Sequence, residues 1–187
     1  MKRYLLLFVL FLSAFQGRTQ TKTFFDLVFS DSVMKNILIP AGMSADGPFT
    51  VIERGDQWSR ERFFKMDESR QAYLYAYDDP IIEQLIEPKE WSMVAHIALS
   101  KYAGTFKQYN NRIKLIARHD VKKQGNYFSL SSPVIYRNLG VIDLRYYSLK
   151  DGNSLEQGLK GQALFVFRKD DHKVWHLERV VNNLLVD

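Results

Sequence analysis

The chain has 187 residues, 46% of them hydrophobic and 14% aromatic, which fits one domain with a buried core and excludes wholesale disorder. Its formal net charge is +5, from 26 basic and 21 acidic residues. It has no cysteine, which excludes disulfides, a thiol nucleophile and cysteine metal ligands.

The first twenty residues have the pattern of a secretory signal peptide. Lys2 and Arg3 precede an apolar run over residues 4–15, and small and polar residues follow it. Such peptides contain an apolar region of ~7–15 residues, whereas a membrane-spanning helix needs ~20. We therefore expect residues 1–20 to be a signal peptide that is cleaved between residues 16 and 20, and residues 21–187 to form a single α+β domain.

Export would change what the charge and the missing cysteine imply. From residue 21 onward the chain has 23 basic and 21 acidic residues, a net charge of +2. This small charge does not favour nucleic-acid binding. A bacterial lipoprotein carries a lipidated cysteine directly after its signal peptide, and this chain has none. We expect a periplasmic or secreted protein without a lipid anchor, a membrane span or a nucleic-acid partner.

The first half of the domain predicts mainly helices. A short helix within residues 23–40 ends before Pro40, a short strand fits residues 49–56, and another short helix fits residues 80–87. A longer helix is expected from Pro88 to a stop at Gly104. One helical stripe on it holds Trp91, Val94, Ala95, Ala98 and Tyr102.

Three tyrosines lie between the predicted helices. Tyr73, Tyr75 and Tyr77 alternate with small or apolar residues, which favours a strand with three tyrosines on one face; a helix over residues 63–77 is the alternative. Aromatic faces stack on sugar rings and cations, so these tyrosines are ligand-binding candidates. Tyrosines that pack with their hydroxyl groups at the rim are the structural alternative.

The second half predicts strands rich in β-branched and aromatic residues, at 112–117, 126–137, 140–149, 161–169 and 173–181. Pro133 is expected at an edge or a bulge. The predicted fold is α+β: N-terminal helices followed by a curved antiparallel sheet, a meander covered on one face and closed by a C-terminal hairpin.

The segments SSPVIYRNLGVIDLRYYSL and ALFVFRKDDHKVWHLERVV resemble the C-terminal half of many small secreted bacterial proteins of unknown function. They resemble more loosely the strands of the nuclear-transport-factor-two-like cone fold. The resemblance covers about fifty residues, rests on hydrophobic spacing and Trp175, and implies an antiparallel sheet without implying any functional residue.

The stretch HKVWH places His172 and His176 four residues apart, as in helical metal sites. The flanking segments, however, predict a hairpin, and four strand residues span about 13 Å at ~3.3 Å each. Two imidazoles that far apart cannot share a zinc ion at ~2.1 Å per bond. We therefore predict no metal and no cofactor.

A turn centred on Asp171 and His172 would pair Lys169 with Val174. The apolar core face of this hairpin would then hold Leu164, Val166, Trp175 and Leu177. The opposite face would combine two aromatic and two polar side chains, and it would be either a pocket or interface or a half-covered outer face. These ligand-binding candidates are Phe165, Phe167, His176 and Glu178.

Asp143 and Arg145 share a face of the strand at 140–149 with Val141 and Tyr147. The simplest interpretation is an ion pair in solvent, which contributes ~0–1 kcal/mol. If that face is concave, the same two side chains are candidates to orient a polar ligand.

No catalytic motif is present. The first hypothesis is therefore an exported, non-catalytic domain that binds a small molecule or an envelope protein. The second is a hydrolase or isomerase with a dispersed site, made of His96, Asp143, Arg145, His176 and Glu178. The third is a structural envelope protein that self-associates through the tyrosine strand.

Overall fold

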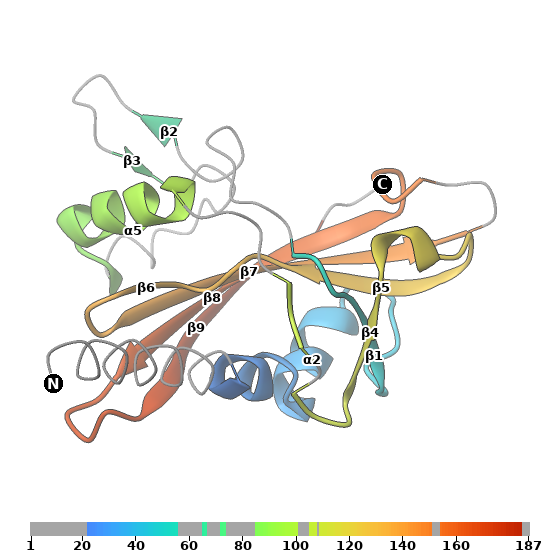
Figure 1. Ribbon diagram of the computed structural model, residues 1–187, viewed down its shortest axis with the longest axis horizontal. Coiled ribbons are helices and arrows are strands. Elements are labelled where there is room, and N and C mark those ends of the chain that lie inside the picture. The colour runs from blue at the N-terminus through green and yellow to red at the C-terminus, as the bar shows by residue number, and fades with distance from the viewer. Residues whose placement is uncertain are drawn as a thin grey trace, which may run out of the picture.

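The computed structural model describes residues 22–55, 65–66, 72–73, 85–100, 105–107, 109–150 and 154–184. Residues 22–28 are helical and lead into α2 (Figure 1). The helices and strands that follow are α2 (Asp31–Leu38), β1 (Phe49–Ile52), β2 (Lys65–Met66), β3 (Ala72–Tyr73), α5 (Pro88–Ser100), β4 (Ile113–Ile116), the 3-10 helix η1 (Arg118–Asp120), β5 (Gly125–Leu130), β6 (Val134–Tyr136), β7 (Leu139–Leu149), β8 (Leu159–Lys169) and β9 (Trp175–Leu184).

The main sheet is mixed rather than purely antiparallel. Its strand order is β4-β1-β5-β7-β8-β9, with β6 also paired to β7, and β2 and β3 form a separate pair. The strands from β5 to β9 are antiparallel, as the predicted meander requires, and β8 and β9 close it as a hairpin. However, β1 pairs in parallel with both β4 and β5. The α+β class is confirmed, while the simple order of helices before strands is not, because β1 precedes α5.

Strands β5 and β6 lie along the same edge of β7 as two parts of one interrupted strand. Leu130 in β5 pairs with Leu144, and Val134 in β6 pairs with Val141. The interruption includes Pro133, which has no N–H group to donate to a sheet ladder. The sequence predicted this proline at an edge or a bulge, and the structure places it in the interruption between β5 and β6.

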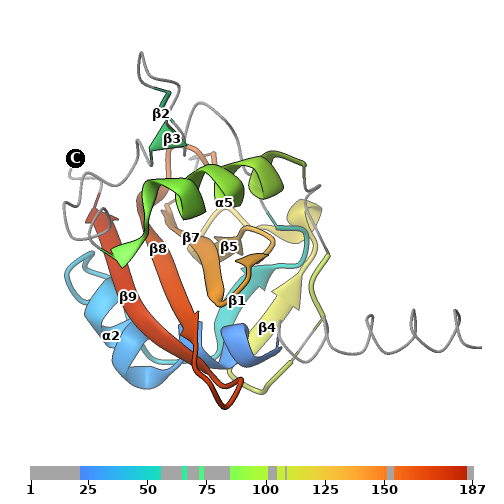
Figure 2. The same ribbon diagram turned by 90° about the vertical axis from the view of Figure 1, so that its left-hand side faces the viewer.

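Helices cover both faces of the sheet, so the prediction of one covered face was wrong (Figures 1 and 2). On one face, here called the α2 face, the helix at residues 22–28 and α2 pack against β5, β7 and β8. On the opposite α5 face, the predicted helical stripe packs against β6, β7 and β8. That stripe is confirmed at Trp91, Val94, Ala95 and Ala98. Ten of the eleven residues of β7 are buried as a result.

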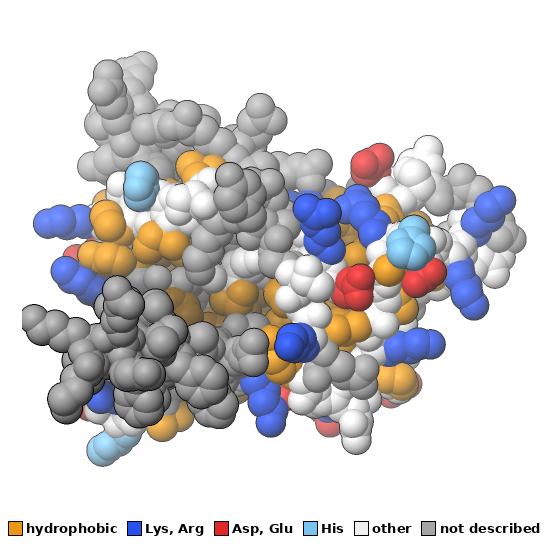
Figure 3. All heavy atoms as spheres, viewed as in Figure 1, with side chains coloured by type: hydrophobic (Ala, Val, Ile, Leu, Met, Phe, Trp, Pro, Cys, Tyr) orange, Lys and Arg blue, Asp and Glu red, His pale blue; other side chains and the backbone are white. Residues whose placement is uncertain are grey.

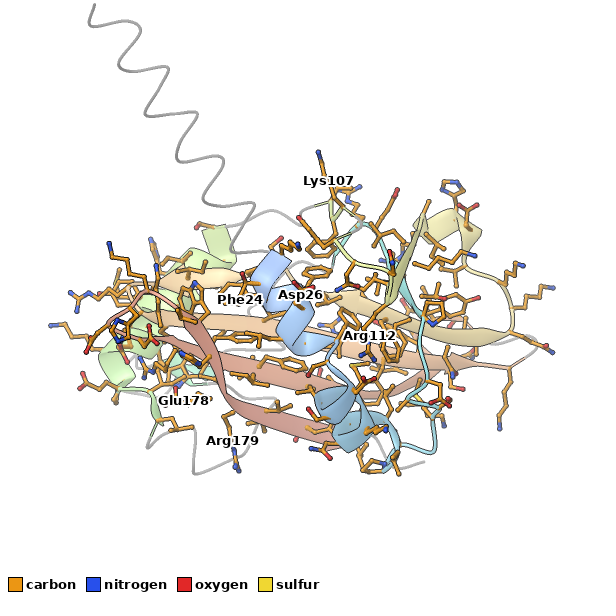
Figure 4. The ribbon with its side chains drawn as sticks, turned by 90° about the horizontal axis from the view of Figure 1, so that it is seen from below. Phe24, Asp26, Lys107, Arg112, Glu178 and Arg179 are labelled. Atoms are coloured by element: carbon orange, nitrogen blue, oxygen red, sulfur yellow. The ribbon has the colours of Figure 1, made fainter. Side chains whose placement is uncertain are left out.

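Aromatic rings hold the first helix to the α2 face. Phe24 packs against Phe167 with ring centroids 4.6 Å apart, and against Trp175 at 5.0 Å (Figure 4). Elsewhere on this face, the buried Tyr146 hydroxyl donates a hydrogen bond to Asn182. Burial raises the pKa of Tyr146 to about 12. Gly161 lies beside this phenol, where a Cβ atom would come within 2.1 Å of the hydroxyl oxygen, so a side chain at position 161 has no room.

The register of the C-terminal hairpin differs from the predicted one. Lys169 pairs with Trp175 rather than with Val174, and Arg168 pairs with His176. The turn is longer than expected because the Asp170 carboxylate accepts a hydrogen bond from the Val174 N–H at 2.8 Å, which holds residue 174 inside the turn. A shift of one residue moves each strand side chain to the opposite face.

The predicted aromatic-polar face therefore does not exist. Phe165 and Phe167 lie on the α2 face together with Trp175, and both are 0% exposed. His176 and Glu178 are exposed; Glu178 is hydrogen-bonded to Arg168, which pairs with His176. The two phenylalanines are parts of the core in this structure.

Several sequence predictions fall on residues that the structure does not describe. Residues 1–20, Tyr75 and Tyr77 lie outside the described residues, as does most of the helix predicted over residues 80–87. Tyr73 lies at the end of β3. No helix in the described part of the chain is both long and apolar enough to cross a lipid bilayer.

The hairpin register of the structure predicts that two truncations in this hairpin differ strongly in their effect on the free energy of unfolding. Phe165→Ala should lower the free energy of unfolding by about 3–5 kcal/mol, because it leaves a cavity in a closed core. Val174→Ala, whose side chain is 50% exposed, should change it by less than about 0.5 kcal/mol. Urea unfolding of both variants measures this difference. Equal, small losses of stability in both variants would contradict the burial of Phe165 and favour the outer face that the sequence predicted for it.

Candidate functional site

The buried polar side chains of the described residues gather in one place. They are Ser129 (3% exposed), Ser131 (1%), Asp143 (1%) and Arg145 (5%). We call these four residues the polar cluster. A charge is rarely buried in a small domain unless it is paired or has a function, so this cluster is the first candidate for a functional site.

Strand alternation and register bring the polar cluster together. Asp143 and Arg145 are two residues apart on β7, so both side chains point to the same face, as the sequence predicted; that face is the α5 face, since Val141 packs there. Ser129 on β5 pairs directly with Arg145. At the Pro133 interruption, the Ser131 N–H donates to the Asp143 carbonyl at 2.9 Å, and the Asp143 N–H donates to Ser131 Oγ, also at 2.9 Å. A side chain thus replaces one of the missing ladder partners.

The two charges form a buried ion pair rather than the solvent-exposed pair that the sequence favoured. Arg145 Nε lies 3.6 Å from Asp143 Oδ2. On β8, Leu164 lies opposite Asp143, and Gln162 lies opposite Arg145. Removing two charges from water carries a penalty of several kcal/mol per ion, which their attraction only partly offsets. Such a pair therefore adds little to the free energy of unfolding. Recognition of a ligand is another role that a buried ion pair can have.

The polar cluster lies between two apolar regions of the same face. On one side is the α5 cluster, which includes Val141 and Leu164. On the other is a smaller cluster of Tyr127, Tyr147 and Leu149. The arrangement places a guanidinium group, a carboxylate and hydroxyl groups between two apolar clusters. This donor and acceptor set suits a small ligand that both donates and accepts hydrogen bonds, such as a polyol or a zwitterion.

A second charged group fastens α5 to the hairpin. Arg168 donates to Glu178 Oε2 at 3.0 Å, to Glu90 at 3.3 and 3.4 Å, and to the Leu85 carbonyl at 2.5 Å. Glu178, on the edge strand β9, is thereby held in a structural ion pair (Figure 4). This network explains how the start of α5 is positioned over β8.

His176, near the start of β9, contacts the turn residue Asp170 and not the polar cluster. Its Nε2 lies 2.8 Å from Asp170 Oδ2, and its side chain is 60% exposed. The hydrogen bond to His176, followed by that from the Val174 N–H, holds the pKa of Asp170 below its usual value. His172 lies in the exposed turn four residues before.

The dispersed catalytic site is not assembled. His96 is exposed on α5, His176 contacts Asp170, and Glu178 contacts Arg168, while Asp143 and Arg145 are paired inside the sheet. Among the described residues, no three histidine or acidic side chains come close enough to hold a metal ion together.

Comparisons with models of known protein families, with characterised proteins and with solved structures give no significant match. The functional argument therefore rests on the geometry of this chain.

Ser129 and Ser131 were missed by the sequence interpretation. Neither lies in a motif, and their importance follows from the pairing of β5 with β7. The signal that was available is Pro133: a proline after two serines marks the point where a hydroxyl group can replace a backbone partner.

The polar cluster predicts a specific pattern of stability. Arg145→Met leaves the Asp143 carboxylate buried beside an apolar side chain, and should lower the free energy of unfolding by about 3–5 kcal/mol. The double variant Asp143→Leu/Arg145→Met removes both charges and should recover most of that loss. Arg54→Met, at an exposed position, is the matched control. Equal losses for Arg145→Met and Arg54→Met would show that Arg145 is solvated.

The turn predicts a measurable titration. Folding lowers the pKa of Asp170, so the ionised Asp170 carboxylate stabilises the folded protein at pH values above the pKa that this group has in the unfolded chain. This stabilisation is lost as the pH falls through the lower pKa of the folded protein. In an NMR titration, Asp170 should titrate below 3.8, and His176→Ala should raise its pKa toward that value. An unchanged pKa in His176→Ala would contradict the contact.

Proposed function

We propose that this chain is an exported, non-catalytic binding domain whose ligand contacts the polar cluster. The observation that carries the proposal is that the buried serine and charged side chains of the described residues gather on one face, at β7 and the end of β5. The signal-like pattern of residues 1–20 supports export. The absence of a catalytic motif from the sequence supports binding rather than catalysis.

The chemistry of the cluster limits the ligand. Asp143 and Arg145 together carry no net charge, so the site does not select a simple anion or cation. Ser129 and Ser131 add hydroxyl groups that both donate and accept. The matching ligand is small and polar, with neighbouring donors and acceptors, as in a polyol or a molecule with ammonium and carboxylate groups.

The two other functions have less support. A dispersed hydrolase or isomerase site is not supported, because its five residues lie in separate contacts. Self-association through the tyrosine strand stays a hypothesis, since Tyr75 and Tyr77 lie outside the described residues.

Native mass spectrometry of the protein recovered from the exported fraction of the producing cell tests this function. We expect a chain that begins between residues 17 and 21, and a bound small molecule that is lost on unfolding. Ser129→Ala keeps the ion pair and removes one hydroxyl group. The amount of ligand bound to this variant should be at least about fivefold lower than the amount bound to the wild-type protein. Ser148→Ala, near the end of β7, is the control and should retain the wild-type amount.

Three results would reject the proposal. They are a chain that keeps residues 1–20, a wild-type protein without bound ligand, and equal retention by the two serine variants. Turnover of ester, glycoside or peptide substrates at enzyme-like rates would replace binding with catalysis.

A further inference from the structure

One end of the sheet carries an excess of positive charge. The described residues 114–123, 150 and 154–160 contain six basic and two acidic residues, a net charge of +4, whereas the whole chain from residue 21 has +2. We call this region the basic end. Its basic residues are Lys114, Arg118, Lys122, Lys123, Lys150 and Lys160, all exposed except Lys160, which is half-buried.

The strand connections explain why these cations lie together. β4 leads through η1 into β5, and Gly125 at the start of β5 pairs with Leu149 at the end of β7. Tyr147 pairs with Leu159 at the start of β8. The segment that joins β4 to β5, Lys150 and residues 154–158 before β8 therefore lie at the same end of the sheet, on the right in Figure 1. Figure 3 shows lysine, arginine and histidine side chains gathered there around η1.

Half-buried apolar side chains lie among these cations. Ile116, Val121, Leu155 and Leu159 pack on the cluster of Tyr127, Tyr147 and Leu149 and stay partly accessible. The lysine-bearing segment is fixed to this cluster, because the Lys122 N–H donates to the Tyr127 hydroxyl group at 3.1 Å. The basic end thus combines a packed, partly accessible apolar patch with exposed cationic side chains around it.

We propose that the basic end docks on an anionic lipid surface. Lysine and arginine side chains reach phosphate headgroups, while the accessible apolar groups enter the boundary between headgroups and acyl chains. A soluble polyanion would satisfy the charges and leave the apolar patch in water, so the combination favours lipid. This surface lies beyond the polar cluster, and the proposal does not depend on the ligand proposed above.

Vesicle co-sedimentation of the full chain tests this proposal. Vesicles of phosphatidylcholine alone measure binding through the apolar segment at residues 4–15, and vesicles with roughly one third phosphatidylglycerol add the electrostatic contribution. We expect tighter binding to the anionic vesicles at about 0.05 M salt, and loss of that difference at about 0.5 M. Each surface cation contributes about fivefold, so Lys122→Gln/Lys123→Gln should weaken the anionic binding by about 25-fold.

The matched control is Lys35→Gln/Lys89→Gln, which removes two exposed cations from α2 and α5. It should bind anionic vesicles within about twofold of the wild-type chain. Circular dichroism of each variant confirms that it is folded. Equal binding to both kinds of vesicle overturns the proposal, as does an equal loss in the two double variants. Binding to heparin without binding to anionic vesicles also overturns it, in favour of a soluble polyanion.

Discussion

The burial of both faces of β7 and β8 is the constraint on which the rest of this structure depends. The helix at residues 22–28 and α2 close one face with aromatic side chains, and α5 closes the other with its Trp91 stripe. Side chains in the middle of these two strands are therefore mostly buried, whichever face they point to. This is why Phe165 and Val166, neighbours on β8, are both 0% exposed although they face opposite helices.

The burial of β7 also determines the environment of the polar cluster. On a sheet with one open face, Asp143 and Arg145 would lie in water and contribute little. In this structure they form a buried ion pair, and their position opposite Ser129 and beside Ser131 joins four polar groups. Most of the other side chains of β7 are apolar, so this short polar stretch stands out from its surroundings. Recognition of a polar ligand is the function that best fits that contrast.

The cluster and the basic end divide the α5 face into regions of different chemistry. Val141 and Leu164 lie under α5, the ion pair follows along β7, and Tyr147 then joins the apolar cluster around which the lysines gather. One strand therefore passes from a closed core through a buried ion pair to a cationic surface. A binding domain that also rests on an anionic surface would have its ligand site close to that surface.

The sequence by itself determined the elements and their local character. The strands near 113–116, 139–149 and 159–169, the α5 stripe and the break at Pro133 all follow from periodicity and from the missing proline N–H group, which are local properties. Only the tertiary structure decided which faces are covered, the parallel pairing of β1, and the hairpin register, which the Asp170 carboxylate shifts by one residue. Those depend on contacts between residues far apart in the chain or on one side-chain hydrogen bond. The site shows both contributions, because the sequence placed Asp143 and Arg145 on one face, and only the tertiary structure turned them into a buried pair.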